Sequence, residues 1–350
     1  GDAEPMRYHT LFLGSSAAVA IAAAVACSHS GPASISPSTI APIVDARFRF
    51  SRYPSVLDPA GLRIASPRAN RAGFDSCPAS GATEYVSDEF NSVIDIYNGK
   101  FAGQAPCGQI TSTLLIHPNG LYVDRASHDL YVANWGGSNI LVFHKGQTVP
   151  YNIYADPAVP LPYDVALSGD GTVVASNEEA SGGFRKGSIS TWVGGPNGGT
   201  FVGNYPMTND DFGLYLTIRP TGTIYFNDID ATSGIGALWS VTCPAGVCGA
   251  QTQVSGVSFK DPGGMAFDDT GDLLVNDATA STLDTFELPN PQPSTTAIPC
   301  CPIGMAYDTL HQHWLATSIT YAAEYSYPSF TLIGTVPVTG GALLGIAVDP

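Results

Sequence analysis

Six short apolar segments of the chain end in asparagine, aspartate or threonine, and acidic or aromatic residues follow several of them. Amide and carboxylate oxygens can hold a cation such as Ca²⁺ or a basic molecule. Aromatic rings beside them would add stacking surfaces. The candidate ligand-binding residues are Asp88, Asn119, Asn134, Trp135, Tyr163, Asp164, Asn177, Glu178, Asp211, Phe212, Asn227, Asp228, Asn276 and Asp277. The alternative is that the asparagines and aspartates cap loops through Asx turns, with the remaining acids in solvent.

Two apolar phrases recur along the chain, and their repetition indicates how these residues are positioned. The first phrase is a glycine, an apolar tripeptide and often an aspartate, with Asp164 in place of the glycine in one copy. First phrases span residues 120–124, 164–168, 213–217, 264–268, 304–308 and 345–349. Second phrases span residues 84–88, 130–134, 173–177, 224–228, 273–277 and 314–317. Successive second phrases lie about 40 to 50 residues apart, the length of one four-stranded propeller blade.

Six copies predict an all-β fold, a six-bladed β-propeller with four-stranded blades over residues 75–350. The second phrase at 84–88 has no partner before it, and the first phrase at 345–349 has none after it. We therefore expect the C-terminal strand to pair with the N-terminal blade and close the ring, which removes exposed sheet edges. Propeller topology places the starts of first strands and the ends of second strands on one face. That face would gather the candidate residues.

The chain resembles NHL/YVTN-type propellers in two of its repeats. Tyr131-Val-Ala-Asn134 followed by Ser138-Asn-Ile-Leu-Val142 is close to the YVTN signature, and Tyr85-Val-Ser-Asp88 begins a looser copy. The resemblance covers about residues 75 to 350 and extends to the six-bladed architecture of SMP-30/gluconolactonase-like proteins. It implies a fold and leaves the activity open, because this fold hosts many functions.

Gluconolactonase-like propellers carry an axial metal on Glu, Asn and Asp, and only Asn119 matches one of that family's metal-ligand motifs. The equivalent positions in the other copies hold Tyr, Phe, Gly, Ile and Leu, which offer no suitable side-chain oxygen. We therefore expect a non-catalytic ligand- or protein-binding or scaffold role, and the alternative is a metal-dependent lactonase, hydrolase or streptogramin-lyase-like enzyme. Ca²⁺ or another divalent cation at Asn119 is the cofactor that this alternative would use.

Histidines are few, and the repeat places them away from the candidate face. His128, His311 and His313 fall in or beside turns between first and second strands, on the opposite face. His311 and His313 have the spacing of a metal pair on a strand, although solvated turn histidines are the favoured interpretation. The chain contains no nucleophile elbow, Walker loop, zinc-protease or EF-hand pattern.

The cysteines fit an exported protein. Cys27 aside, six remain, and six cysteines allow 15 pairings. Proximity in the sequence favours three bonds, Cys77–Cys107, Cys243–Cys248 and a vicinal Cys300–Cys301, with free or otherwise paired cysteines as the alternative.

The first 27 residues read as upstream residues and a signal peptide. Arg7 precedes an apolar run that ends Ala24-Val25-Ala26-Cys27, which resembles a bacterial lipobox. Lipid attachment at Cys27 would anchor the chain to the bacterial cell envelope, periplasmic or at the outer membrane; the alternative is simple cleavage and secretion. Residues 28–74 read as a linker, rich in Ser and Pro and with arginines between 47 and 71.

The composition of the chain disfavours some classes of partner and of fold. The formal net charge is −16, which disfavours a nucleic-acid partner. With 38 glycines, 27 prolines and 31 Tyr plus Phe, the chain favours turns and strands over helical bundles. We expect a monomer that binds a protein, peptide or small molecule, preferably cationic, through an acidic face.

Overall fold

The computed structural model describes residues 77, 82–99, 101, 105–179, 186–195, 199–208, 211–230, 233–288, 292–298, 302–318, 321–337 and 342–349. All of them belong to one compact unit, residues 63–350. The predicted signal peptide, Cys27 and the whole linker at residues 28–74 lie outside the described residues, as do Cys300 and Cys301.

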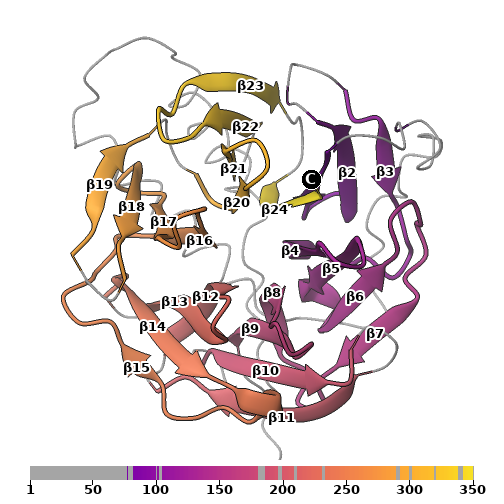
Figure 1. The fold of residues 1–350 in the computed structure, drawn as a ribbon. Coiled ribbons are helices and arrows are strands. Elements are labelled where there is room, and N and C mark those ends of the chain that lie inside the picture. Colours follow the sequence, from indigo (N-terminus) through magenta and orange to yellow (C-terminus); the bar gives the residue numbers. More distant parts are fainter. Residues whose placement is uncertain are drawn as a thin grey trace, which may run out of the picture. The chain divides into compact units, whose positions relative to one another are not determined.

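Six antiparallel sheets of four strands form a ring, with the first strand of each sheet nearest the axis (Figure 1). This confirms the predicted six-bladed β-propeller. Blade one is β24 (Leu343–Asp349), β1 (Thr83–Asp88), β2 (Val93–Asn98) and β3 (Gly108–Ile110). Blade two is β4 (Pro118–Asp124), β5 (Asp129–Asn134), β6 (Asn139–Phe143) and β7 (Asn152–Ala155). Blade three is β8 (Leu161–Leu167), β9 (Val173–Glu179), β10 (Ser188–Val193) and β11 (Thr200–Pro206).

The second half of the ring repeats the same order. Blade four is β12 (Asp211–Ile218), β13 (Thr223–Asp230), β14 (Gly236–Thr242) and β15 (Thr252–Gln253). Blade five is β16 (Pro262–Phe267), β17 (Leu273–Asp277), β18 (Thr282–Phe286) and β19 (Ser294–Ala297). Blade six is β20 (Met305–Asp308), β21 (His313–Thr317), β22 (Tyr321–Ser326) and β23 (Leu332–Pro337).

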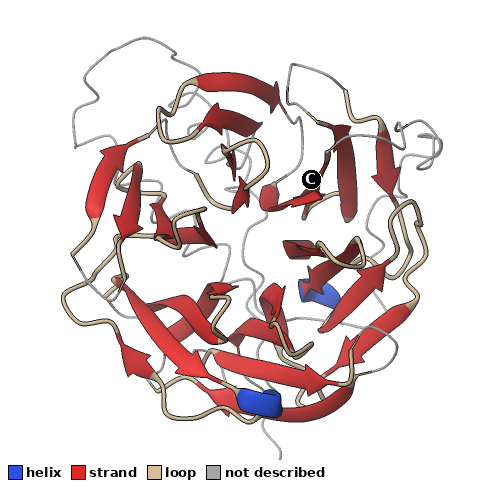
Figure 2. Ribbon diagram, viewed as in Figure 1, coloured by secondary structure: helices blue, strands red, loops and turns tan. Residues whose placement is uncertain are grey.

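The helical segments of the described residues are two short 3₁₀ turns, Trp135–Gly137 between β5 and β6 and Pro244–Gly246 between β14 and β15 (Figure 2). No helix in this part of the chain has the length and apolar character needed to cross a membrane. Tight turns join first to second strands in blades two to six. A glycine with positive φ completes the turn in blades three, four and five, as Gly222 (φ 89°) and Gly271 (φ 85°) do, and His128 and Gln312 take the corresponding position in blades two and six. Such a φ is accessible to glycine and strained for other residues.

The core is divided among the interfaces between neighbouring blades. Ile94, Leu121 and Leu130 belong to one buried cluster that joins blades one and two, and Met305 and Trp314 belong to another that joins blades five and six. Alternate side chains of a strand face opposite sides of its sheet, so each middle strand is apolar on both faces. Burial of those side chains holds the blades against one another.

Ring closure follows the predicted route. β24 pairs antiparallel with β1, from Thr83 opposite Asp349 to Asp88 opposite Leu343. The buried Asp349 carboxylate also reaches blade two, where it contacts His128 Nδ1 at 2.7 Å and Lys145 Nζ at 2.6 Å. The C-terminal strand is therefore fixed to both blades beside it.

The register of blade four corrects the repeat alignment made from the sequence. Second-strand Phe226 is opposite Leu216, whereas its equivalent in blade five, Val275, is opposite Met265. Tyr215, and not Gly213, therefore occupies the position of Gly264 in the ring. A β-bulge between Gly213 and Leu216 accompanies the displacement of two residues.

Two of the predicted disulfides are present. Cys77 and Cys107 are bonded with their Cα atoms 5.0 Å apart, and Cys243 is bonded to Cys248 across the Pro244–Gly246 turn. Disulfides persist in oxidising compartments, so both bonds are consistent with an extracellular or periplasmic location.

Candidate functional site on the upper face

The face that carries the starts of first strands and the ends of second strands is called here the upper face. Most of the candidate residues on it are buried and bonded to neighbouring loops. Asn134 accepts a hydrogen bond from Ile116 N (2.7 Å) through Oδ1 and donates one to Leu114 O (2.9 Å). Asp277 accepts from Lys260 N at 2.7 Å. These two side chains hold the connections that lead into their own blades.

Two further strand-end residues make similar contacts. Asp88 accepts hydrogen bonds from the backbone and side chain of Asn91. Asn177 donates to the hydroxyls of Ser188 and Ser190, at 2.9 and 2.8 Å. Asp88 therefore caps the loop that follows its strand, whereas Asn177 joins its strand to the neighbouring strand β10.

The residue one place earlier in the second strand links its blade to the next one. Asn227 donates to Gly263 O at 2.7 Å and accepts from Tyr215 N at 2.9 Å. Asn276 donates to Gly304 O at 3.5 Å. These bonds join side chains to the innermost strands, so Asn227 and Asn276 contribute to the integrity of the ring.

The carboxyls of Asp211 and Asp228 are hydrogen-bonded to each other at the start of blade four. Both are buried, and burial together with the charge of Asp211 raises the pKa of Asp228 to about 8. The pair therefore holds a proton near neutral pH. Phe212 beside it is 8% exposed, too deep in the blade for its ring to serve as an open stacking surface.

Asn119, the predicted metal ligand, is buried, and its Oδ1 has no hydrogen-bond partner. Within the described part of the chain, no three His, Cys, Asp or Glu side chains come together in a way that could hold a metal. One amide oxygen is a poor donor set for a divalent cation. The residues described around Asn119 therefore do not fit a metal centre.

On the upper face, a partly exposed aromatic ring, Trp135, lies beside a carboxyl with a raised pKa, Glu178. Trp135 is half-buried, and its Nε1 donates a hydrogen bond to Glu178 Oε2 at 2.7 Å, from blade two to blade three. Burial raises the pKa of Glu178 to about 8 against the opposing effect of this hydrogen bond, and the charges of Glu179 and Glu89 raise it further.

Three residues outside the list of candidate ligand-binding residues complete this cluster, namely Glu89, His117 and Glu179. The carboxyl of Glu89, in blade one, has a pKa raised to about 7 by burial and by Asp88. The His117 ring packs edge-on against Trp135, with ring centroids 6.1 Å apart, and its Nδ1 has no hydrogen-bond partner. Burial lowers the pKa of His117, partly offset by a hydrogen bond to the backbone of Glu89. Glu89, His117, Trp135, Glu178 and Glu179 are called here the Trp135 cluster.

Among the described residues, no lysine or arginine forms an ion pair with a carboxyl of this cluster. The raised pKa values of Glu89 and Glu178, about 7 and about 8, keep these two carboxyls partly protonated near neutral pH, and burial raises the pKa of Glu179 as well. A group of this kind can exchange its protons for a bound cation, or can donate and accept protons in a reaction. Trp135 adds an aromatic face that attracts cations.

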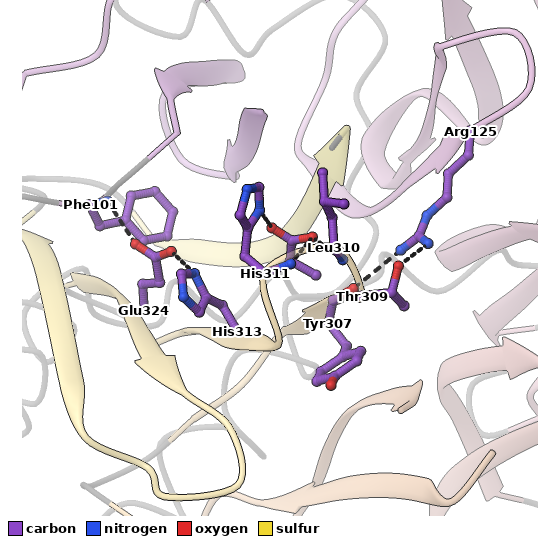
Figure 3. A network of polar contacts seen from close by, with 9 residues as sticks. Phe101, Arg125, Tyr307, Thr309, Leu310, His311, His313 and Glu324 are labelled. Carbon is purple, nitrogen blue, oxygen red and sulfur yellow. Dashed lines mark hydrogen bonds and ion pairs between the residues drawn. The ribbon is translucent and has the colours of Figure 1, made fainter. Parts of the chain in front are cut away.

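The predicted turn histidines lie on the opposite face, called here the turn face. Each of them bonds a buried carboxylate through Nδ1, and His128 bonds Asp349. His311 bonds Asp308 at 2.6 Å and His313 bonds Glu324 at 2.6 Å, and Figure 3 shows these two histidines. These histidines tie turns and strands together.

No protein-family model matches the chain, and no curated protein matches its sequence. Solved structures share its fold. A chain of the nidogen/laminin complex is 12% identical with a TM-score of 0.59, covering 77% of this chain and 99% of that one. A protein of unknown function from Bacteroides caccae is 11% identical with a TM-score of 0.57 and the same coverage.

A third similar structure is regucalcin from Agrobacterium tumefaciens, a calcium-binding protein. It is 15% identical with a TM-score of 0.51, covering 68% of this chain and 79% of that one. Likenesses at these identities establish the six-bladed propeller, in agreement with the NHL/YVTN-type resemblance, and leave the activity to be argued from this chain's own residues.

Proposed function

We propose that the protein binds a cationic ligand on its upper face, over Trp135 and against Glu178 and Glu89. The observation that supports this most is the hydrogen bond from Trp135 to a buried Glu178 that has no positive partner among the described residues. A bound cation would supply the missing charge and would stack on the indole. The net charge of −16 would also draw cations towards the protein.

Binding should depend on pH in a defined direction. Below about pH 7 the carboxyls of Glu89 and Glu178 are mostly protonated, and a cation must displace those protons. We therefore expect affinity to rise between pH 6 and pH 9, with proton release on binding. Calorimetry with tetramethylammonium in buffers of different ionisation heat would measure both quantities. Ca²⁺ is a second probe, and tert-butanol is the uncharged control of similar shape.

Substitutions distinguish the contribution of the Glu178 charge to binding from that of the Trp135 ring. Trp135→Ala and Glu178→Gln should each weaken tetramethylammonium binding about tenfold. Asp269→Asn, an equal charge change at an exposed position near the turn face, should leave binding nearly unchanged. Equal affinity in wild type and Glu178→Gln, with no dependence on pH, would contradict the proposal.

A catalytic role is the second candidate, and the two carboxyls with raised pKa favour it. A hydrolase or lyase needs an acid and a base that exchange protons near neutral pH, and Glu89 and Glu178 have pKa values of about 7 and about 8. A panel of lactones and esters tests this role. Turnover that disappears in Glu178→Gln would replace the binding proposal with an enzymatic one.

The anchoring proposal concerns Cys27, outside the described residues. If Cys27 carries a lipid, Cys27→Ser should move the protein from the membrane fraction to the soluble periplasmic or secreted fraction, because it removes the acyl chains that hold it there. The thermal midpoint of the propeller should stay the same. Fractionation with mass spectrometry of the mature N-terminus measures this. An unacylated N-terminus in the wild type would overturn the proposal.

A further inference from the structure

A cavity of about 340 Å³ occupies the axis of the propeller. The central and final residues of all six first strands line it, together with Arg125, Pro220 and Thr309 from the turns that follow. The cavity therefore lies in the half of the axis nearer the turn face, away from the Trp135 cluster. Small and apolar side chains provide much of its wall, among them Val165, Ala166, Met265, Ala266, Met305 and Ala306.

The inner end of the cavity is formed where equivalent residues of the six blades meet. Four of the six positions are glycines, and the other two are Asp164 and Tyr215 in adjacent blades. Tyr215 Oη donates to Leu344 O at 3.4 Å, from blade four to the first strand of blade one, and Tyr163 packs edge-on against its ring. A Cβ added to Gly120 would lie 2.0 Å from Asp164 Oδ1, so glycine there makes room for the carboxyl.

The Asp164 carboxyl has acceptor positions to spare. It is buried, with Oδ1 accepting from Val165 N at 2.9 Å and Oδ2 from Leu216 N at 3.0 Å. A carboxylate has about four acceptor positions, so two of them have no partner among the described residues. No ion pair joins Asp164 to a lysine or arginine of the described residues, and burial raises its pKa to about 7. A buried acceptor that lines a cavity is suited to a hydrogen-bond donor from a ligand.

Two charged residues line the outer end of the cavity: Arg125, and Asp268, whose Oδ2 accepts a hydrogen bond from Tyr327 Oη at 2.8 Å. Arg125, in the first turn of blade two, donates to Thr309 Oγ1 and to Tyr307 O in blade six (Figure 3). Arg125, which carries a permanent positive charge, is among the residues that line the cavity. A permanent cation would meet this charge on entering, whereas an uncharged molecule would not.

We propose that the axial cavity is a second binding site, for a compact, uncharged, mainly apolar molecule that donates an N–H to Asp164. The volume lies at the lower end of the range for small-molecule sites, which usually combine an apolar wall with a few fixed polar groups. This site is independent of the cation site on the upper face, because its wall, its polar group and its opening are different.

Indole and benzofuran make a matched pair of probes, since they share size and shape and only indole carries an N–H. Binding followed by ligand-observed NMR should show indole preferred by about tenfold in the wild-type protein. Asp164→Asn, which replaces one of the two acceptor oxygens by an NH₂ donor, should weaken that preference and leave benzofuran binding unchanged. Ala306→Phe, which fills the cavity from its wall, should abolish the binding of both probes.

Each variant is also tested with the probe of the other site, so that failure of the cation-site proposal can be told from failure of the cavity proposal. Glu178→Gln should leave indole binding intact, and Asp164→Asn should leave tetramethylammonium binding intact. Equal affinity of wild type for indole and benzofuran overturns the role of Asp164 without requiring any variant to fold. Unchanged indole binding in Ala306→Phe, or no detectable indole binding, overturns the site itself.

Discussion

Deletion of residues 345–350 is expected to unfold the propeller, or to lower its thermal midpoint by tens of degrees. It removes most of β24, whose Ile346, Ala347 and Val348 are 3%, 4% and 8% exposed, and leaves β1 with an unpaired edge. Loss of large buried side chains costs about 1 to 4 kcal/mol each, so the sum reaches much of the 5 to 15 kcal/mol that stabilises a typical domain. Calorimetry of wild-type and truncated protein measures the effect.

A rearranged chain provides the matched control. Residues 342–350 can be placed ahead of residue 75, so that the strand precedes β1 in place of following blade six. Because β24 and β1 are antiparallel, with Asp349 opposite Thr83, the joining segment of about eight residues makes a hairpin loop. This variant should recover most of the lost stability. A truncated protein with the wild-type midpoint would show that β24 is dispensable for the ring.

The fold could be predicted because its signal is repeated. Strands of one kind recur at blade spacing, and the two incomplete ends at residues 84–88 and 345–349 identify the closing pair. The alignment failed in blade four because Gly213-Leu-Tyr-Leu-Thr217 reads like the other first phrases. The bulge between Gly213 and Leu216 changes which residue faces the axis, and sequence similarity does not show a bulge. Tyr215 as the axial residue therefore came only from the strand register.

The sequence predicted which face of the ring carries the candidate residues, but not which of them contact one another. Topology alone gathers Asn134, Asn177 and Asp277 at one end of the ring, and yet asparagine and aspartate serve both as ligands and as loop caps. Only the contacts distinguish the two roles. The Trp135–Glu178 bond joins residues 43 apart in sequence and in different blades, so no local pattern reveals it. His117 carries no repeat signal and escapes sequence analysis for the same reason.

The largest electrostatic effect is expected at Glu84, which lies on β1, the strand that pairs with the closing strand β24. Glu84 is 3% exposed, and its Oε2 has no hydrogen-bond partner. Burial, and then the charges of Glu324 and Asp308, raise its pKa to about 8. Both neighbours are engaged with histidines, since His313 bonds Glu324 and His311 bonds Asp308. Glu84 is thus a buried acid at the seam between blades one and six.

The sign of the pH effect follows from proton binding. Between the unfolded pKa of 4.5 and the folded pKa of about 8, the folded state holds the proton that the unfolded state has lost. The free energy of unfolding therefore falls as pH rises through this range, and it levels off above about pH 8. Glu84→Gln replaces the protonated acid by a neutral group of similar shape, so it should change little at pH 5.

At pH 9 the same substitution should stabilise the protein, on the order of 2 to 4 kcal/mol, because the buried charge is gone. Urea denaturation of both proteins between pH 5 and pH 9 measures the difference, which isolates Glu84 from the other buried acids. Glu287→Gln, at an exposed position, should follow the wild-type curve. Parallel curves for wild type and Glu84→Gln would mean that the Glu84 carboxyl keeps an ordinary pKa, and that the seam has a compensating positive charge or water beside it.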